Sequence, residues 1–162
     1  LGKKNNNISK ILGIEDSLAA CDVLSARRIK KLDLGLANAQ HFLTEATIST
    51  EDTNIKIDSN YSIEIIKNGE IKIINIPTSN DLPENIIPSA SDGVLELFIK
   101  TRSSKFINNN ISNESLFSFK RLNIINPKKA VLIDDSVSIP TPVNISIAKE
   151  KIDMIVGKER IF

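Results

Sequence analysis

The sequence has few of the side chains on which most enzyme sites depend. It contains one cysteine, one histidine, one methionine and no tryptophan, and aromatic residues make up only 4% of the chain. A single cysteine excludes an internal disulfide framework and a zinc site built on several thiolates. A single histidine excludes sites that need two imidazoles from one chain. These absences favour a protein that works through its surfaces, and the sequence predicts a chain that is not an enzyme.

An excess of charge of one sign is also lacking. The 21 Lys and Arg residues nearly cancel the 20 Asp and Glu residues, which removes the broad attraction to phosphate behind most binding to nucleic acids and anionic membranes. No stretch approaches the roughly 20 apolar residues of a membrane span, and no charged-then-apolar leader is present. We therefore expect a soluble protein with no membrane partner. Its compartment stays open, with a virion as one candidate location.

Aliphatic residues dominate what is present. Hydrophobic residues make up 41% of the 162 residues, and most are Ile, Leu and Val, which favour strands. A chain of this length can bury one core. The predicted fold class is α+β, with an N-terminal amphipathic helical segment followed by a mostly antiparallel β-sheet body, as a sandwich or a small barrel-like sheet. We expect residues 1–50 to hold the extension and helical segment and residues 53–162 to form the β-rich domain, within a single compact unit.

The helical segment is predicted from Asp16 to about Thr44. This stretch has no proline and one glycine, and its apolar residues recur at helical spacing: Leu18, Cys21, Leu24, Ile29, Leu32, Leu36 and Leu43. Asp16 or Ser17 can supply the N-cap. Four basic residues follow within it: Arg27, Arg28, Lys30 and Lys31. They are interpreted as a solvent-facing helix surface or, alternatively, as a contact to phosphate or to a partner protein.

One short motif precedes that segment. Residues 8–14, followed by Ser17 and Leu18, resemble the middle of a helix-turn-helix, in which a glycine lies in the turn before the recognition helix; here that glycine is Gly13. The resemblance would imply DNA binding. It departs from the pattern at Ala19, it lacks room for a full supporting helix, and its Glu15, Asp16 and Asp22 would repel phosphates. The alternative is a helix start whose apolar lead-in packs on the body of the protein.

Alternation with period two begins at Thr53 and predicts strands at Ile55 and Ile57, at residues 61–66 and at residues 70–76. A three-residue loop from Lys67 to Gly69 would join the last two as a hairpin. This register pairs Ile65 with Ile71 and Ile63 with Ile73 and gives one apolar face. Gly69 is then expected to adopt a left-handed backbone conformation in a β-bulge.

Further along, residues 94–101, 116–125 and 130–133 are predicted strands, and Asp134-Asp135-Ser136 is a predicted turn. The extended segment that holds Pro140 and Pro142 must lie at a sheet edge or outside the sheet. Residues 143–147 and 152–156 are predicted to close the fold as a hairpin, with a short helix from Ala148 to Val156 as the alternative. The proline-containing segment from Pro77 to Gly93 is predicted to be a long loop that binds a partner or stays functionless.

Candidate reactive groups are sparse. His41 is interpreted as a structural or solvent-facing residue, and Cys21 as a small hydrophobe on the apolar stripe of the helix. Asp134 and Asp135 could bind a divalent cation together with Glu96 or Glu114, although adjacent Asp residues before a Ser are more typical of a turn. No glycine-rich loop follows a strand, so we expect no phosphate cradle, no cofactor and no metal.

These observations favour a structural or assembly subunit of a multi-protein complex, for instance a capsid, connector or tail component of a phage-type virion. The expected partners are other protein subunits, in a homo- or hetero-oligomer. The alternative is a small nucleic-acid-binding or regulatory module that uses the basic helix. The candidate interaction residues are Arg27, Arg28, Lys30, Lys31, Pro83, Pro88, Pro140 and Pro142.

Overall fold

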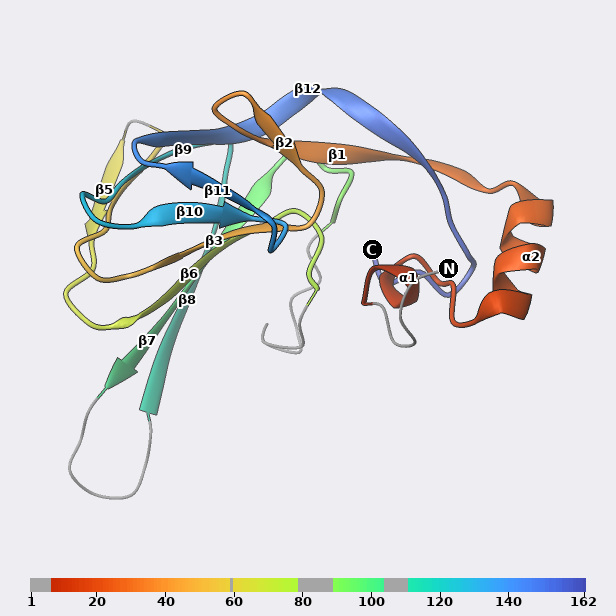
Figure 1. Cartoon of the computed structure of the whole chain (residues 1–162), viewed down its shortest axis with the longest axis horizontal. Helices are drawn as coiled ribbons and strands as arrows, with labels where there is room; N and C mark the ends of the chain where they lie inside the picture. Colours follow the sequence, from red (N-terminus) through yellow and green to blue (C-terminus); the bar gives the residue numbers. More distant parts are fainter. Residues whose placement is uncertain (1–6, 59, 79–88, 104–110) are drawn as a thin grey trace.

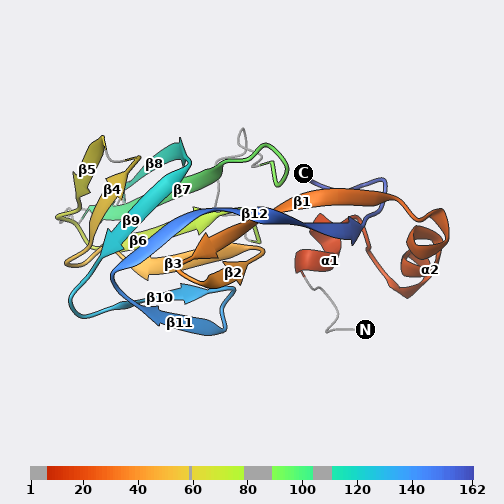
Figure 2. The ribbon, with the colours of Figure 1, turned by 90° about the horizontal axis from the view of Figure 1, so that it is seen from above.

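The computed structural model describes residues 7–58, 60–78, 89–103 and 111–162. These residues are mostly β and form two six-stranded antiparallel sheets that pack face to face (Figures 1 and 2). The first sheet has the order β2-β1-β12-β9-β4-β5, and its strands are β1 (Ile29–Ala37), β2 (Gln40–Phe42), β4 (Asn54–Ile57), β5 (Tyr61–Glu64), β9 (Arg121–Ile125) and β12 (Val143–Ile155). The second has the order β11-β10-β3-β6-β7-β8, and its strands are β3 (Glu45–Ser49), β6 (Gly69–Ile74), β7 (Leu95–Ser103), β8 (Ile111–Phe119), β10 (Ala130–Ile133) and β11 (Val137–Pro140).

The core between the sheets follows from alternation along the strands. Successive side chains of a strand point to opposite faces, so every second residue of each strand faces the other sheet. Both sheets contribute fully buried isoleucines to this core, such as Ile55 and Ile124 from the first and Ile71 and Ile73 from the second. The other face of the second sheet, which we call its outer face, carries the residues between them, including Thr47, Lys72 and Phe98.

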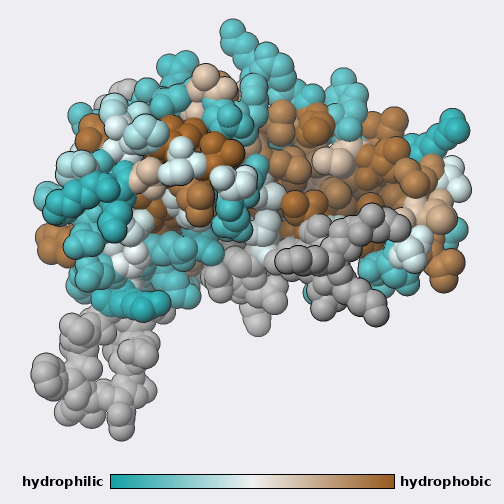
Figure 3. All heavy atoms as spheres, viewed as in Figure 1, coloured by the Kyte–Doolittle hydropathy of each residue, from teal (hydrophilic) through white to brown (hydrophobic). Residues whose placement is uncertain are grey.

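A two-stranded ribbon extends beyond the sandwich. The first half of β1 pairs with the last residues of β12, and a bulge between Asp33 and Gly35 marks where the ribbon joins the sheet. The helix α1 (Asn7–Ile11) packs beside the ribbon, near both ends of the chain (Figure 1). A second apolar cluster forms there from Ile11, Leu12, Leu32, Ile76, Ala90 and Val156. Figure 3 shows hydrophobic residues gathered at the surface in this region.

The predicted fold class was wrong in its helical segment. The helix α2 covers only Ser17–Ala26, with Asp16 as its N-cap, and it ends where Arg27 adopts a left-handed conformation with φ 47°. Residues 29–37 form β1 instead, because pairing with β12 outweighs a local helical pattern that was only approximate. The apolar stripe is also misplaced: Leu18 and Leu24 are 78% and 59% exposed, Cys21 is exposed, and Val23 is the buried residue of α2.

The helix-turn-helix resemblance holds only for the local order of elements. Gly13 has φ +73° and lies in the turn between α1 and α2, as that motif requires. However, Ile11 and Leu12 are buried in the second apolar cluster. The alternative interpretation, in which this lead-in packs on the body of the protein, is therefore confirmed.

The predicted hairpin around Gly69 was wrong. β5 pairs with β4 in the first sheet, whereas β6 lies between β3 and β7 in the second. Gly69 has no left-handed φ; a Cβ on it would lie 2.0 Å from the Lys100 carbonyl oxygen. The glycine is thus required by the close approach of β7 and not by a turn.

The predicted closing hairpin and its helical alternative were also wrong, because residues 143–155 form one continuous strand, β12. Lys149-Glu150 offers no turn residue, and β1 supplies a partner for both halves of β12. The predicted strand at 116–125 is divided at Lys120 between β8 and β9, which lie in different sheets.

Several local predictions are confirmed. β4, β7 and β10 lie where strands were predicted, and the turn at Asp134 and Asp135 joins β10 to β11 with φ of 45° and 53° at the two residues. Pro140 ends β11, which is one of the two edge strands of the second sheet. The boundary at residues 50–53 stays a prediction; β1 and β3, which precede it, pair with β12 and β6, which follow it.

Candidate functional site

Buried polar side chains gather where β1, β6 and the segment before β7 meet. Asp33 is 1% exposed, and its carboxylate lies 2.7 Å from Lys151 Nζ and accepts a hydrogen bond from the Gly93 backbone N–H at 2.9 Å. The Asn75 side-chain amide donates to the carbonyls of Asp33 and Leu43, both at 2.8 Å. The charge of Asp33 is therefore compensated, and the network fixes the ends of these elements relative to one another.

The turn between β10 and β11 joins the same region. The Asp134 carboxylate accepts hydrogen bonds from the backbone N–H groups of Leu43, Thr44 and Glu45 at 2.9–3.3 Å, and from the Thr44 hydroxyl at 2.6 Å. These four donors occupy the oxygens that a cation would need. Within the described residues, no group of three or more His, Cys, Asp or Glu side chains could hold a metal ion. Asp134 thus links the turn between β10 and β11 to residues 43–45 through hydrogen bonds.

Two buried glutamates lie on the outer face of the second sheet. Glu45 pairs with Ile74, and Ile74 pairs with Glu96 on the next strand, so the two carboxyl groups flank one buried isoleucine. Glu45 is 7% exposed and Glu96 is 6% exposed. One carboxyl oxygen of each is buried and has no hydrogen-bond partner. We call Glu45, Ile74 and Glu96 the carboxyl row.

The carboxyl row holds its protons more tightly than exposed glutamates do. Burial raises the pKa of Glu96 to about 7, and the negative charge of Asp92 adds to the shift. Burial also raises the pKa of Glu45, which the positive charge of Lys72 partly opposes. A carboxyl group with a pKa near neutrality can both accept and release a proton under physiological conditions. Glu96 therefore has a pKa in the range that proton transfer at neutral pH requires.

An open groove of about 810 Å³ lies further along the same outer face, across β10, β3, β6 and β7. Thr47 and Leu132 contribute to its wall on one side. Lys100, Arg102 and Lys129 bring three positive charges to its lining, against one negative charge from Glu70. The outer face thus carries acidic groups at one end and a basic groove at the other.

The structure does not bring the predicted interaction residues together as one helix surface. Arg27 caps α2, Arg28 follows it, and Lys30 and Lys31 lie in β1. Pro140 and Pro142 flank a turn after β11, with a cis bond before Pro142, whereas Pro83 and Pro88 lie outside the described residues. A role for any of them in binding stays a prediction.

The single histidine and the single cysteine of the sequence lie on other elements than the carboxyl row. His41 on β2 is partly exposed, with its Nε2 3.8 Å from a Glu150 carboxyl oxygen, which confirms the solvent-facing interpretation. Cys21 is exposed on α2, so the prediction that it packs as a small hydrophobe was wrong. No helix among the described residues has the length and apolar character to cross a membrane.

Comparison with solved structures gives a clear result for the fold. A diacylglycerol kinase from Bacillus anthracis strain Sterne superposes with a TM-score of 0.74 at 20% identity, over 99% of this chain and 66% of that chain. Two further structures from the same organism, assigned to the same class, give TM-scores of 0.76 and 0.77 at 20% and 18% identity, over 68% and 69% of their chains. The chain has the fold of these proteins. No known protein family and no curated protein matches the sequence itself.

This result corrects the predicted function. The similar structures are those of diacylglycerol kinases and not of capsid, connector or tail components, so the prediction of a virion or assembly subunit was wrong. Its nucleic-acid-binding alternative and the expected protein partners stay predictions. The prediction that the chain is not an enzyme is overturned by the same finding.

Sequence reasoning named Glu96 only as a partner for a cation at Asp134, and it missed Glu45. A weak signal was present, because Glu96 interrupts an otherwise apolar run from Val94 to Ile99. Glu45 gives no such signal, because it lies between Thr44 and Ala46, directly after the predicted end of the helical segment.

Proposed function

We propose that the chain acts as a kinase that phosphorylates the hydroxyl group of a lipid alcohol of the diacylglycerol type. The observation that carries this proposal is the similarity in fold to diacylglycerol kinases over 99% of the chain. The chain spans 66% to 69% of the length of those structures, and the proposal concerns the activity of this chain by itself.

The carboxyl row suits that role chemically. Catalysis of phosphoryl transfer to an alcohol depends mainly on positioning the reactants and on stabilising the charge of the transition state. A carboxylate accepts the hydroxyl proton. Glu96, with a pKa of about 7, can accept that proton once it is ionised. Lys72 lies beside the row on β6 and is 7% exposed, so its positive charge acts in a poorly hydrated environment.

The test is a kinase assay of the chain with dioctanoylglycerol in detergent micelles, labelled ATP and Mg²⁺. We expect labelled phosphatidate, and a rate that rises with pH through a midpoint near 7 as Glu96 loses its proton. Glu96→Gln should lower the rate by at least about 100-fold without loss of folding, because it removes the base. Glu64→Gln, a matched change at an exposed residue of β5, should leave the rate unchanged.

Two results would count against the proposal in different ways. Absence of both product and dioctanoylglycerol binding would reject a lipid kinase function for this chain. Full activity of Glu96→Gln would keep the lipid kinase function and reject Glu96 as its base.

A further inference from the structure

The basic groove on the outer face of the second sheet carries an excess of positive charge, and ion pairs within the sheet compensate only part of it. Lys100 Nζ lies 3.1 Å from a Glu114 carboxyl oxygen, and Glu70 lies 3.9 Å from Lys72 Nζ, so these four charges compensate one another in pairs. Arg102 and Lys129 line the groove without an ion pair to any described residue. Two cations are therefore available to a ligand.

The backbone presents these two cations from opposite sides of the groove. Lys129 directly precedes β10, and Arg102 lies near the end of β7; β3 and β6 separate the two strands. Neighbouring strands lie about 4.8 Å apart, which places the two backbones roughly 14 Å apart across the sheet. Long side chains that reach inward from both walls can meet a small anion between them.

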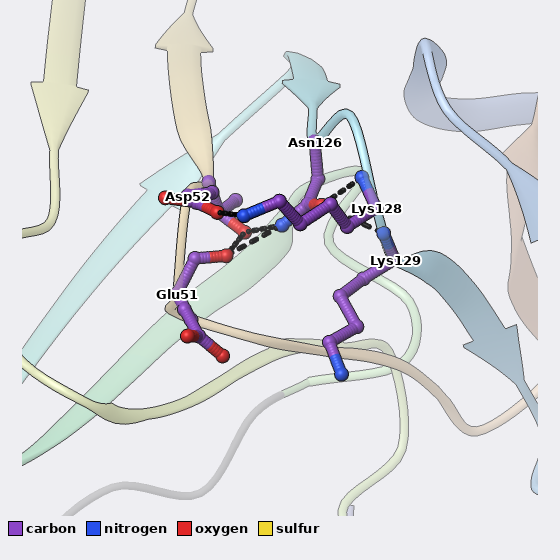
Figure 4. Close-up of polar contacts among 6 residues, drawn as sticks. Glu51, Asp52, Asn126, Lys128 and Lys129 are labelled. Carbon is purple, nitrogen blue, oxygen red and sulfur yellow. Dashed lines mark hydrogen bonds and ion pairs between the residues drawn. The ribbon is translucent and has the colours of Figure 1, made fainter.

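A buried asparagine holds the backbone of two adjacent lysines, and of these two Lys129 lines the groove. The Asn126 side chain is 3% exposed, accepts hydrogen bonds from the backbone N–H groups of Lys128 and Lys129, and donates to Glu51 and Thr53. Figure 4 shows the consequence: Lys128 turns toward Asp52, with Nζ 2.7 Å from its carboxylate, whereas the Lys129 side chain extends away from this network. The hydrogen bond to Asp52 also raises the pKa of Lys128.

We propose that this groove binds a phosphomonoester group between Arg102 and Lys129. A phosphomonoester carries nearly two negative charges at neutral pH and offers three acceptor oxygens, which matches two uncompensated cations, one of them a guanidinium fork. The Asn68 amide and the Thr47 hydroxyl in the same lining can add neutral hydrogen bonds. Both free phosphate esters and lipid phosphate headgroups carry this group. The site lies apart from the carboxyl row and does not require kinase activity.

The test is an NMR titration of the ¹⁵N-labelled chain with inorganic phosphate and with glycerol 3-phosphate, in low salt and without ATP. We expect saturable shifts of the amides of Gly69 and Ala130, which lie in the groove. Arg102→Gln and Lys129→Gln should each weaken binding about three-fold, and the double variant about ten-fold, because each removes one exposed charge contact. Lys128→Gln is the matched control and should bind as the wild type does.

A second arm distinguishes the source of the phosphate group. Sedimentation with phosphatidate-containing vesicles, but not with phosphatidylcholine vesicles, would identify a lipid headgroup; titration without sedimentation would identify a soluble phosphate ester. The proposal is overturned if the groove amides do not shift, or if Lys128→Gln weakens binding as much as Lys129→Gln. Neither result would affect the kinase assay, so the two proposals can fail separately.

Discussion

Glu96 illustrates how a sheet can hold an acidic group away from water. Its neighbours across the sheet are Ile74 and Ser118, and one of its carboxyl oxygens is buried without a partner. Burial costs the ionised carboxylate more free energy than the neutral carboxyl group, because the charge loses its hydration. The pKa of Glu96 therefore rises to about 7. Glu96→Leu would remove this cost, because leucine carries no charge that must lose its hydration.

The burial of Glu96 predicts a pH dependence of stability. The unfolded chain releases this proton near pH 4.5 and the folded chain near pH 7, so the native state binds more protons in that interval. The free energy of unfolding should therefore decline by about 3 kcal/mol as the pH rises from 4.5 to above 7. Urea unfolding at pH 5 and pH 8 should show this decline in the wild type and in Glu64→Gln, and a smaller decline in Glu96→Gln, in which only the raised pKa of Glu45 still contributes. The same decline in Glu96→Gln would contradict the assignment.

Asp134 shows which features of a single residue can be predicted from the sequence and which cannot. Its place in a turn follows from Asp-Asp-Ser alone, because Asp tolerates the left-handed conformation and forms local turns. Its carboxylate, however, binds backbone groups of Leu43, Thr44 and Glu45, about 90 residues away. Nothing local in the sequence specifies those partners, so the turn could be predicted and these long-range hydrogen bonds could not.

Among the elements, β1 and β12 show why a periodicity can mislead. Residues 29–37 had apolar spacing that fitted a helix loosely, and residues 143–156 had two alternating runs with a charged stretch between them. Each strand forms because the other is present, through pairs that run from Ile29 with Ile155 to Ala37 with Ile145. A pairing between segments more than 100 residues apart leaves no trace in the local pattern of either.

The exposed face of α2 gives a prediction at the same scale. Because Leu18 and Leu24 contact mainly solvent, Leu18→Gln and Leu24→Gln should each change the free energy of unfolding by no more than about 0.5 kcal/mol, given the similar helix propensities of Leu and Gln. Val23→Ala should cost about 1–2 kcal/mol, since Val23 is 7% exposed. Chemical denaturation monitored by circular dichroism measures both. A large loss from the leucine variants together with a small loss from Val23→Ala would reject the observed orientation of α2.

At the scale of the whole molecule, two separate apolar clusters stabilise the fold. The larger fills the space between the sheets, and the smaller joins α1, the ribbon and the C-terminal residues. The backbone connects the ends of the chain directly, through hydrogen bonds from Gly157 to Leu12 and from Ile161 to Ile11. The sandwich is thus a thick, many-stranded body, whereas the ribbon has a single pair of strands.

This difference predicts unequal protection from hydrogen exchange. Amides of the central strands β6 and β7 should exchange at least about 100-fold more slowly than those of residues 29–32 and 152–155, because an isolated two-stranded ribbon opens more readily than the middle of a six-stranded sheet. Exchange measured residue by residue by NMR tests this. Equal protection in the ribbon and in β6 would show that the molecule opens only as a whole.

The sequence by itself determined the features that depend on near neighbours: the aliphatic core, the strands with clear alternation, the Asp134 turn, the N-cap of α2 and the proline-limited edge at β11. The tertiary structure alone decided the length of α2, the separation of β5 from β6 into different sheets, the continuity of β12, and the burial of Glu45 and Glu96 on one face. These features depend on which distant segments pair, and the free energy of that pairing comes from burial and backbone hydrogen bonds that form only when the sheets assemble. The candidate site is of this second kind, since its groups come from β3, β6 and β7 and meet only in the folded sheet.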